Sequence, residues 1–188
     1  MSNTFMSNTS RRAASLLNAA LVVAVVGWNY WTARHGLFGN DVRGMSEAYD
    51  TQFTPASYAF SIWGLIFLLQ GVHAVHQLRL AFGSKPTRFF DELGPWLLLA
   101  NALNIVWTVA WLGEWTGTSV VILAAINLCL VMALRRTRMG RSKAPVRVVV
   151  LEWLPLGVYA GWVAVAVIAN LSAWLAKEGW VPGNSSAW

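Results

Sequence analysis

The chain alternates between long apolar blocks and shorter polar segments. Five blocks are close to 20 residues long or longer and almost free of charge; they cover residues 14–33, 55–80, 95–112, 118–134 and 148–175. An α-helix rises 1.5 Å per residue, so about 20 apolar residues span the ~30 Å hydrocarbon core of a bilayer. The pattern predicts an all-α membrane protein, a bundle of five transmembrane helices that forms one domain over residues 1–188.

The polar segments between the blocks have the composition of loops and helix ends. The longest, residues 34–54, is rich in Gly and acidic residues, and Pro55 after it suits a first helical turn because its missing N–H would have no partner there. Gly113 to Gly117 predicts a tight hairpin between the third and fourth helices. Residues 176–188 are expected to form an irregular C-terminal tail.

Composition and charge exclude several classes of protein. Hydrophobic residues make up 56% of the 188 and charged residues 12%, against about 25% charged in a soluble domain. The net charge is +6, but the basic residues lie in loops between apolar blocks, so we expect a lipid bilayer and no nucleic acid as partner. Cys129 is the only cysteine and lies inside an apolar block, as a small core residue would.

The basic residues also predict an orientation. Five helices place the two termini on opposite faces of the membrane. The N-terminal face then carries eleven Lys and Arg residues: Arg11, Arg12, Arg79, Lys85, Arg88, Arg135, Arg136, Arg138, Arg141, Lys143 and Arg147. The other face carries three, which are Arg34, Arg43 and Lys177. Because basic loops stay in the cytoplasm, we expect a cytoplasmic N-terminus and a C-terminus on the opposite side.

Polar side chains within the blocks are the first candidates for a functional site, because they are costly in a bilayer and usually face the bundle interior. They are Asn29, Gln70, His73, His76, Asn101, Asn104, Asn127, Glu152 and Asn170.

The third block carries amides and indoles on one helical face. Asn104, Trp107 and Trp111 recur at helical spacing, so this face could line a pocket in which a flat conjugated ligand stacks on the indoles. The alternative is that the Asn side chains bridge helices and the Trp residues lie at the membrane interface.

The last block offers a similar pair. Trp162 and Asn170 lie about two turns apart among small residues, which also suits plain helix packing. The chain has 12 tryptophans, more than two interfacial belts require in a small bundle, and this favours an aromatic-lined cavity.

The titratable groups give little support for catalysis or for a metal site. His73 and His76 are three residues apart, but no Cys, Asp or Glu nearby completes a metal shell, so we interpret them as interfacial. Glu152 near the start of the last block is expected to cap a helix. We find no nucleophile with a positioned base, no phosphate-binding glycine loop and no carboxylate pair, so an enzyme is not favoured.

Three ordered motifs resemble one known family. The first motif resembles the second helix of the tryptophan-rich sensory protein family, also called TspO, translocator protein or peripheral benzodiazepine receptor. It is the segment Phe53-Thr-Pro-Ala-Ser-Tyr-Ala-Phe-Ser-Ile-Trp63-Gly-Leu-Ile-Phe67. Asn104-Ile-Val-Trp107 resembles its Asn-x-x-Trp, and Trp162 with Asn170 matches the spacing in its last helix. A single proline at Pro55 and Asn127 in place of an Asp indicate a divergent member.

The resemblance implies a fold and a type of site. It implies five helices, often as a homodimer, with a hydrophobic ligand held beneath the first loop; porphyrin, haem and sterols are the associated ligands. Matching positions make Trp63, Asn104, Trp107, Trp162 and Asn170 ligand-binding candidates. Tyr58 and Tyr159 join them because each lies near a matched residue and offers an aromatic face with a hydroxyl.

Three hypotheses about function remain open from the sequence. The first is a membrane receptor, sensor or carrier for a flat hydrophobic ligand such as a tetrapyrrole or a sterol-like molecule. The second is a porphyrin-modifying enzyme, and the third a structural subunit of a larger membrane complex. No cofactor is required by the first hypothesis, although a bound porphyrin or haem is compatible with it.

Overall fold

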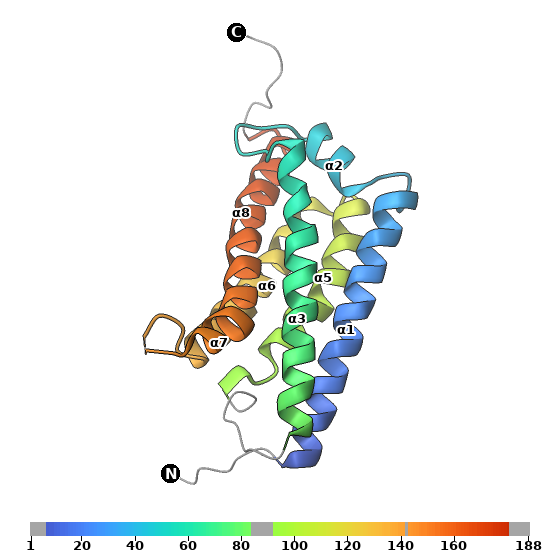
Figure 1. Cartoon of the computed structure of the whole chain (residues 1–188). Helices are drawn as coiled ribbons and strands as arrows, with labels where there is room; N and C mark the ends of the chain where they lie inside the picture. The colour runs from blue at the N-terminus through green and yellow to red at the C-terminus, as the bar shows by residue number, and fades with distance from the viewer. Residues whose placement is uncertain (1–6, 84–91, 142, 181–188) are drawn as a thin grey trace.

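Five long helices make up most of the protein. The computed structural model describes residues 7–83, 92–141 and 143–180, and its long helices are α1 (Asn8–His35), α3 (Ile62–Phe82), α5 (Trp96–Leu112), α6 (Thr116–Arg136) and α8 (Leu154–Lys177) (Figure 1). Four short elements are α2 (Val42–Ala48), a 3₁₀ turn η1 (Ser57–Ser61), α7 (Val146–Val148) and a π-helical turn η2 (Val149–Trp153). Of the expected C-terminal tail, residues 181–188 lie outside the described residues.

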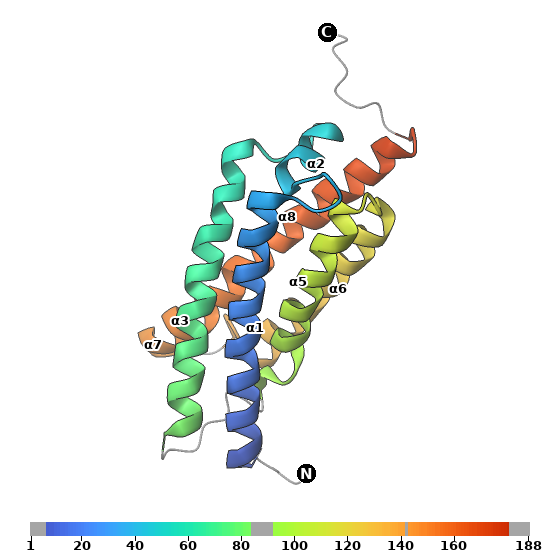
Figure 2. The ribbon, with the colours of Figure 1, turned by 90° about the vertical axis from the view of Figure 1, so that its right-hand side faces the viewer.

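The long helices form a closed ring. α1 packs against α3 and α5, α5 against α6, α6 against α8, and α8 returns to α3 (Figures 1 and 2). The short Gly113 to Trp115 connection makes α5 and α6 antiparallel neighbours. The start of α1 and the end of α8 lie at opposite ends of the bundle. This order brings α3, α5 and α8 around one interior, although they are far apart in sequence.

The outer surface is that of a protein surrounded by lipid. Four helical segments are long and apolar enough to cross a membrane, and α5, with 17 residues, is a shorter apolar helix. Large aliphatic side chains on several helices point outward; Val23 is 73% exposed, Leu68 65% and Val121 69%. Contiguous apolar surface of this kind is rare on soluble monomers and normal in a bilayer.

The first helix begins earlier than the apolar pattern predicted. It starts at Asn8 rather than near residue 14, because the Ser7 hydroxyl caps it by accepting a hydrogen bond from Ser10 N at 3.1 Å. Arg11 and Arg12 are therefore helical. Hydropathy marks where a helix enters the membrane, whereas the cap decides where it begins.

The segment predicted as a plain loop contains a helix. We call residues 36–56 the roof loop, since they cover the end of the bundle where α1 ends (Figure 1). The Asp41 carboxylate accepts hydrogen bonds from Arg43 N and Gly44 N, both at 3.0 Å, and so starts α2. Gly36 adopts φ 68°, and a Cβ there would lie 2.8 Å from the Asn40 carbonyl oxygen, so the turn after α1 requires glycine.

A chain of buried side chains, which we call the polar chain, joins the helices in the half of the bundle where α1 begins. Asn101 Nδ2 donates to Asn18 Oδ1 at 3.2 Å, and Asn18 Nδ2 donates to Gln77 Oε1 at 2.8 Å. Gln77 Nε2 lies 3.2 Å from His73 Nε2, and since an amide nitrogen can only donate, this ring nitrogen accepts. His73 Nδ1 then donates to the Leu151 carbonyl at 2.7 Å.

The Leu151 carbonyl is free to accept the hydrogen bond from His73 because the helical turn that follows it contains a proline. Pro155 lies four residues later and has no N–H to donate to it, and the backbone forms the π-helical turn η2 at this point. In the same turn Glu152 does not cap a helix start, as was expected, but lies 3.1 Å from His76 Nε2 through its Oε1 atom. The two histidines thus join α3 to η2.

We predict that His73→Leu destabilises the protein. The substitution removes the acceptor of Gln77 and the donor of Leu151, and leaving such groups unpaired costs about 1–3 kcal/mol. A thermal unfolding midpoint lower by roughly 2–10 °C is expected in a lipid nanodisc. The control is Val72→Leu, because Val72 lies one residue away and is partly exposed. Unfolding of His73→Leu at the wild-type temperature would contradict the structural role of the polar chain.

Candidate functional site

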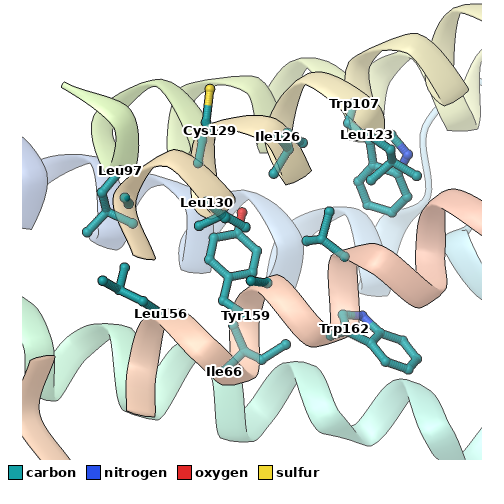
Figure 3. Packing of buried hydrophobic residues seen from close by; sticks show 14 of the residues in the cluster. Ile66, Leu97, Trp107, Leu123, Ile126, Cys129, Leu130, Leu156, Tyr159 and Trp162 are labelled. Carbon is teal, nitrogen blue, oxygen red and sulfur yellow. The ribbon is translucent and has the colours of Figure 1, made fainter. Parts of the chain in front are cut away.

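An aromatic cluster occupies the bundle interior below the roof loop. Its members are Phe60 on η1, Trp63 and Phe67 on α3, Trp107 on α5, and Tyr159 and Trp162 on α8. Trp63 is the centre: its ring centroid lies 5.4 Å from that of Phe67, 6.4 Å from Trp107, 6.2 Å from Tyr159 and 6.5 Å from Trp162. Figure 3 shows Tyr159 pointing into the core from α8, with Trp162 one turn further along.

The backbone between the roof loop and α3 sets the position of Trp63. A helix from Pro55 was predicted, but Ala56 is extended, with φ −55° and ψ 144°, and η1 forms from Ser57 before α3 begins at Ile62. A 3₁₀ turn is tighter than an α-helix, so it fits the short space between the roof loop and α3. Phe60, Trp63 and Phe67 then follow at helical spacing and point the same way.

A large cavity lies beside this cluster. This main cavity has a volume of about 800 Å³, within the range of small-molecule sites, and lies between α1, η1, α3 and α5 under the first residues of α2. Trp63, Phe67 and Trp107 form its inner wall, whereas the exposed Tyr30 and Tyr58 mark its mouth. The remaining lining residues are Val26, Asn29, Ala33, Asp41, Val42, Arg43, Phe60 and Ser61.

The predicted site residues divide into two groups. Trp63, Trp107 and Tyr58 line the main cavity, with Tyr58 82% exposed at the rim. Asn104, Tyr159, Trp162 and Asn170 lie behind this lining. Trp162 and Asn170 line a second cavity of about 30 Å³ that shares the walls of Trp63 and Trp107. Tyr159 lines a third, of about 10 Å³.

The two matched asparagines use their carbonyl oxygens within the protein. Asn104 Oδ1 accepts from Asn29 Nδ2 at 3.0 Å, which joins α5 to α1. Asn170 Oδ1 accepts from Trp107 Nε1 at 3.3 Å and from Ser119 Oγ at 2.8 Å, which joins α8 to α5 and α6. The interpretation that asparagines bridge helices therefore holds for both oxygen atoms, and Asn170 also fixes the indole plane of Trp107.

Several lining residues were not predicted as site residues. Asn29 had been noted only as a polar residue inside the first block, and Phe60 and Phe67 are three and four residues from Trp63, a helical spacing that could have identified them. Arg43 and Tyr30 reach the cavity only through the path of the roof loop and the end of α1. No local pattern in the sequence distinguishes Arg43 from its neighbours in the predicted loop, or Tyr30 from the other aromatic residues at the end of the first block.

Hydrogen bonds hold the roof loop to the ends of α5, α6 and α8. Tyr49 Oη donates to Glu114 Oε2 at 2.9 Å, and Asn40 Nδ2 donates to the Leu112 carbonyl at 2.9 Å. Trp111 Nε1 donates to the Val42 carbonyl at 3.3 Å, and the hydroxyls of Thr51 and Ser172 pair at 3.0 Å, which ties the loop to α8. Lys177 Nζ donates to the Glu114 carbonyl at 2.7 Å and so joins α8 to the α5–α6 hairpin. Hydrogen bonds from Tyr49 and Asn40 lower the pKa of the Glu114 carboxyl, and the nearby Lys177 lowers it further.

The rim of the main cavity carries charge. Asp41 Oδ1 is engaged by two backbone N–H groups, as described above, and Arg34 donates to Tyr30 Oη at 2.6 Å while its guanidinium lies 5.6 Å from the Tyr30 ring centroid. The Arg43 guanidinium has no carboxylate partner among the described residues.

The histidines do not form a metal centre with other residues. Over residues 7–83, 92–141 and 143–180, no group of three or more His, Cys, Asp and Glu side chains is placed to hold a metal ion. His73 and His76 lie beyond the aromatic cluster, toward the start of α1, and make the contacts with η2 already described.

Comparison with protein families agrees with this arrangement. A family model described as TSPO-like protein matches residues 15–188, nearly the whole chain. The chain belongs to the TSPO-like family. No curated protein and no solved structure matches it. Family membership together with its apolar helices makes this TSPO-like protein an integral, multi-pass membrane protein.

We predict that Glu114→Gln loosens the roof loop above acidic pH. The folded state lowers the pKa of Glu114, so the ionised carboxylate stabilises the loop at neutral pH, and this contribution is lost as the pH falls through the lowered pKa. Hydrogen exchange over residues 40–50 should be faster in the variant at pH 7, with the difference from wild type fading as the pH falls through the lowered pKa of Glu114. Glu178→Gln, at the same end, is the control; equal exchange in all three proteins would contradict the role of Glu114.

Proposed function

We propose that this TSPO-like protein is a membrane receptor, sensor or carrier for a flat hydrophobic ligand, with a tetrapyrrole as the leading candidate and a sterol-like molecule as the alternative. The observation that carries the proposal is the main cavity of about 800 Å³, walled by two indole rings, Trp63 and Trp107, whose planes differ by 26°. Two nearly parallel indoles offer flat faces that a conjugated ring can stack against.

The chemistry of the inner wall favours recognition by stacking. The Trp107 N–H is used by Asn170, so this indole contacts a ligand through its ring. The lining contains Tyr, Trp, Phe and Asn but no His, Cys or Met, the commonest axial ligands of haem iron besides Tyr. Tyr30 and Tyr58 at the mouth could bind a haem iron, whereas Trp63, Phe67 and Trp107 of the inner wall can contact only the porphyrin ring.

The rim of the cavity favours a ligand with an acidic group. Arg43 lies where the cavity meets the roof loop and has no carboxylate partner among the residues that the structure describes. An arginine can bind a carboxylate through two parallel hydrogen bonds. Tetrapyrroles combine a flat apolar ring with carboxylate side chains, whereas sterols lack them, and this supports the tetrapyrrole.

The membrane topology is part of the proposal. α5 is about 25 Å long and would cross the bilayer as a fifth span with the help of its flanking turns. The described basic residues of the N-terminal face lie in the first turns of α1, at the ends of α3 and α6, in α7 and in the segment before it. This distribution supports a cytoplasmic N-terminus and a C-terminus on the opposite side; Lys85 and Arg88 lie outside the described residues.

We predict that Trp63→Leu weakens porphyrin binding about tenfold or more. Trp63 contacts every other ring of the inner wall, and its removal takes away one stacking surface. Quenching of tryptophan fluorescence during titration with protoporphyrin measures the affinity. Trp115→Leu is the matched control, because Trp115 is exposed at the α5–α6 hairpin and does not line the cavity. Equal affinities for both variants and wild type would place the ligand elsewhere.

A second prediction concerns the rim. Arg43→Gln should weaken binding of protoporphyrin, which carries carboxylates, by about tenfold, and should leave the affinity for protoporphyrin dimethyl ester nearly unchanged. Arg34→Gln is the comparison, because Arg34 is already engaged with Tyr30. An equal loss for acid and ester would show that Arg43 acts through the fold of the roof loop and not through the carboxylate.

A further inference from the structure

Gln70 is a buried amide without a partner. It lies on the inward face of α3, one turn below Ile66 and Phe67, and is only 3% exposed. Neither its Nε2 nor its Oε1 atom has a hydrogen-bond partner among the described residues. The amides of the neighbouring polar chain pair with one another and with His73, and none of them lies within hydrogen-bond distance of Gln70. An amide in this state is expensive in a low-dielectric interior.

A small cavity adjoins the Gln70 side chain. This is the third cavity described above, here called the lower cavity, and its volume of about 10 Å³ is close to the room that a single water molecule requires. Gln70 and Asn101 are its polar lining residues besides Tyr159, and Trp63, Phe67 and aliphatic residues of α1 and α3 complete it. A buried water needs two to four polar partners, and Gln70 alone provides a donor and an acceptor.

The lower cavity lies directly beneath the main cavity. Val26, Trp63 and Phe67 line both, so the same rings separate Gln70 from a molecule in the main cavity. Asn101, on the other side, is the first donor of the polar chain. A hydrogen-bonding group between Gln70 and Asn101 would therefore lie between the aromatic wall and the polar chain.

We propose that the lower cavity is a binding site for one small hydrogen-bonding group, held by the Gln70 amide and Asn101. The group is a water molecule, or it is the polar end of a ligand that passes Trp63. Both present an oxygen or nitrogen atom that can pair with the Gln70 amide. The ligand as the source of this group rests on the proposed function, whereas the water molecule does not.

The test compares Gln70→Met with wild type in nanodiscs, with and without protoporphyrin and a hydroxyl-bearing sterol. Met is close to Gln in length and volume but cannot form these hydrogen bonds. The matched control is Leu68→Met, which makes a similar change on the exposed face of the same helix. The thermal unfolding midpoint without ligand and the affinity for each probe are measured.

The results separate the two sources. If a water is bound, Gln70→Met lowers the midpoint of the ligand-free protein by about 3 °C or more, even when neither probe binds. If the ligand supplies the group, the affinity for a probe falls about fivefold or more and the ligand-free midpoint does not fall. A midpoint that does not fall, with affinities unchanged, would overturn the proposal, because it would mean that the amide pairs with neither source.

Should Gln70→Met not fold, the wild-type protein still provides a test. Cross peaks between the Gln70 side-chain amide protons and water in an NMR spectrum of the ligand-free protein would support the water. Loss of these cross peaks on adding a probe, with new ones to the probe, would support the ligand. Amide protons that show neither contact in either state would refute the site.

Discussion

A bilayer offers no water to buried polar groups, so each of them must find its partner inside the protein. In this protein side-chain amides form such contacts at two levels of the bundle, and the buried Gln70 amide is an exception. The polar chain ties α1, α3 and α5 to η2 near the start of α1. Closer to the roof loop, Asn29 binds Asn104, and Asn170 binds both Trp107 and Ser119. Together the two levels connect all five long helices.

The same hydrogen bonds shape the site. Because Asn170 holds the indole N–H of Trp107, the ring is fixed before any ligand arrives, and rings fixed in advance lose little conformational entropy on binding. Trp63 is fixed differently, by contacts with rings from α3, α5 and α8. The inner wall is thus a preorganised aromatic surface in which the Trp107 N–H is directed to Asn170.

The main cavity is open between α1 and α3, because the roof loop is anchored on the opposite side of the bundle. Glu114 and Leu112 anchor the loop over α5 and α6, and Thr51 pairs with Ser172 of α8. α1 and α3 lie close together where α1 begins and separate toward α2, as Figure 1 shows. The main cavity occupies this separation, with Tyr30 and Tyr58 at its mouth.

Part of the site was predictable and part was not. The positions of Trp63 and Trp107 on helices of matching motif were enough to identify two residues of the inner wall. Asn104 and Asn170 had the same support from the motifs, yet their carbonyl oxygens serve other helices. A sequence motif records that a polar residue is required at a position, and both a ligand and a neighbouring helix can impose that requirement.

The sequence by itself determined the class, the family and the approximate position of each long helix. Hydropathy blocks are decisive in a membrane because a spanning segment must satisfy its own backbone and match the thickness of the lipid. Only the tertiary structure decided which side of each helix faces inward, how α2 closes the roof loop, and why Leu151 needs His73. Helices that are apolar on all sides give no periodic signal for the inner face, so interhelical hydrogen bonds and ring packing choose it.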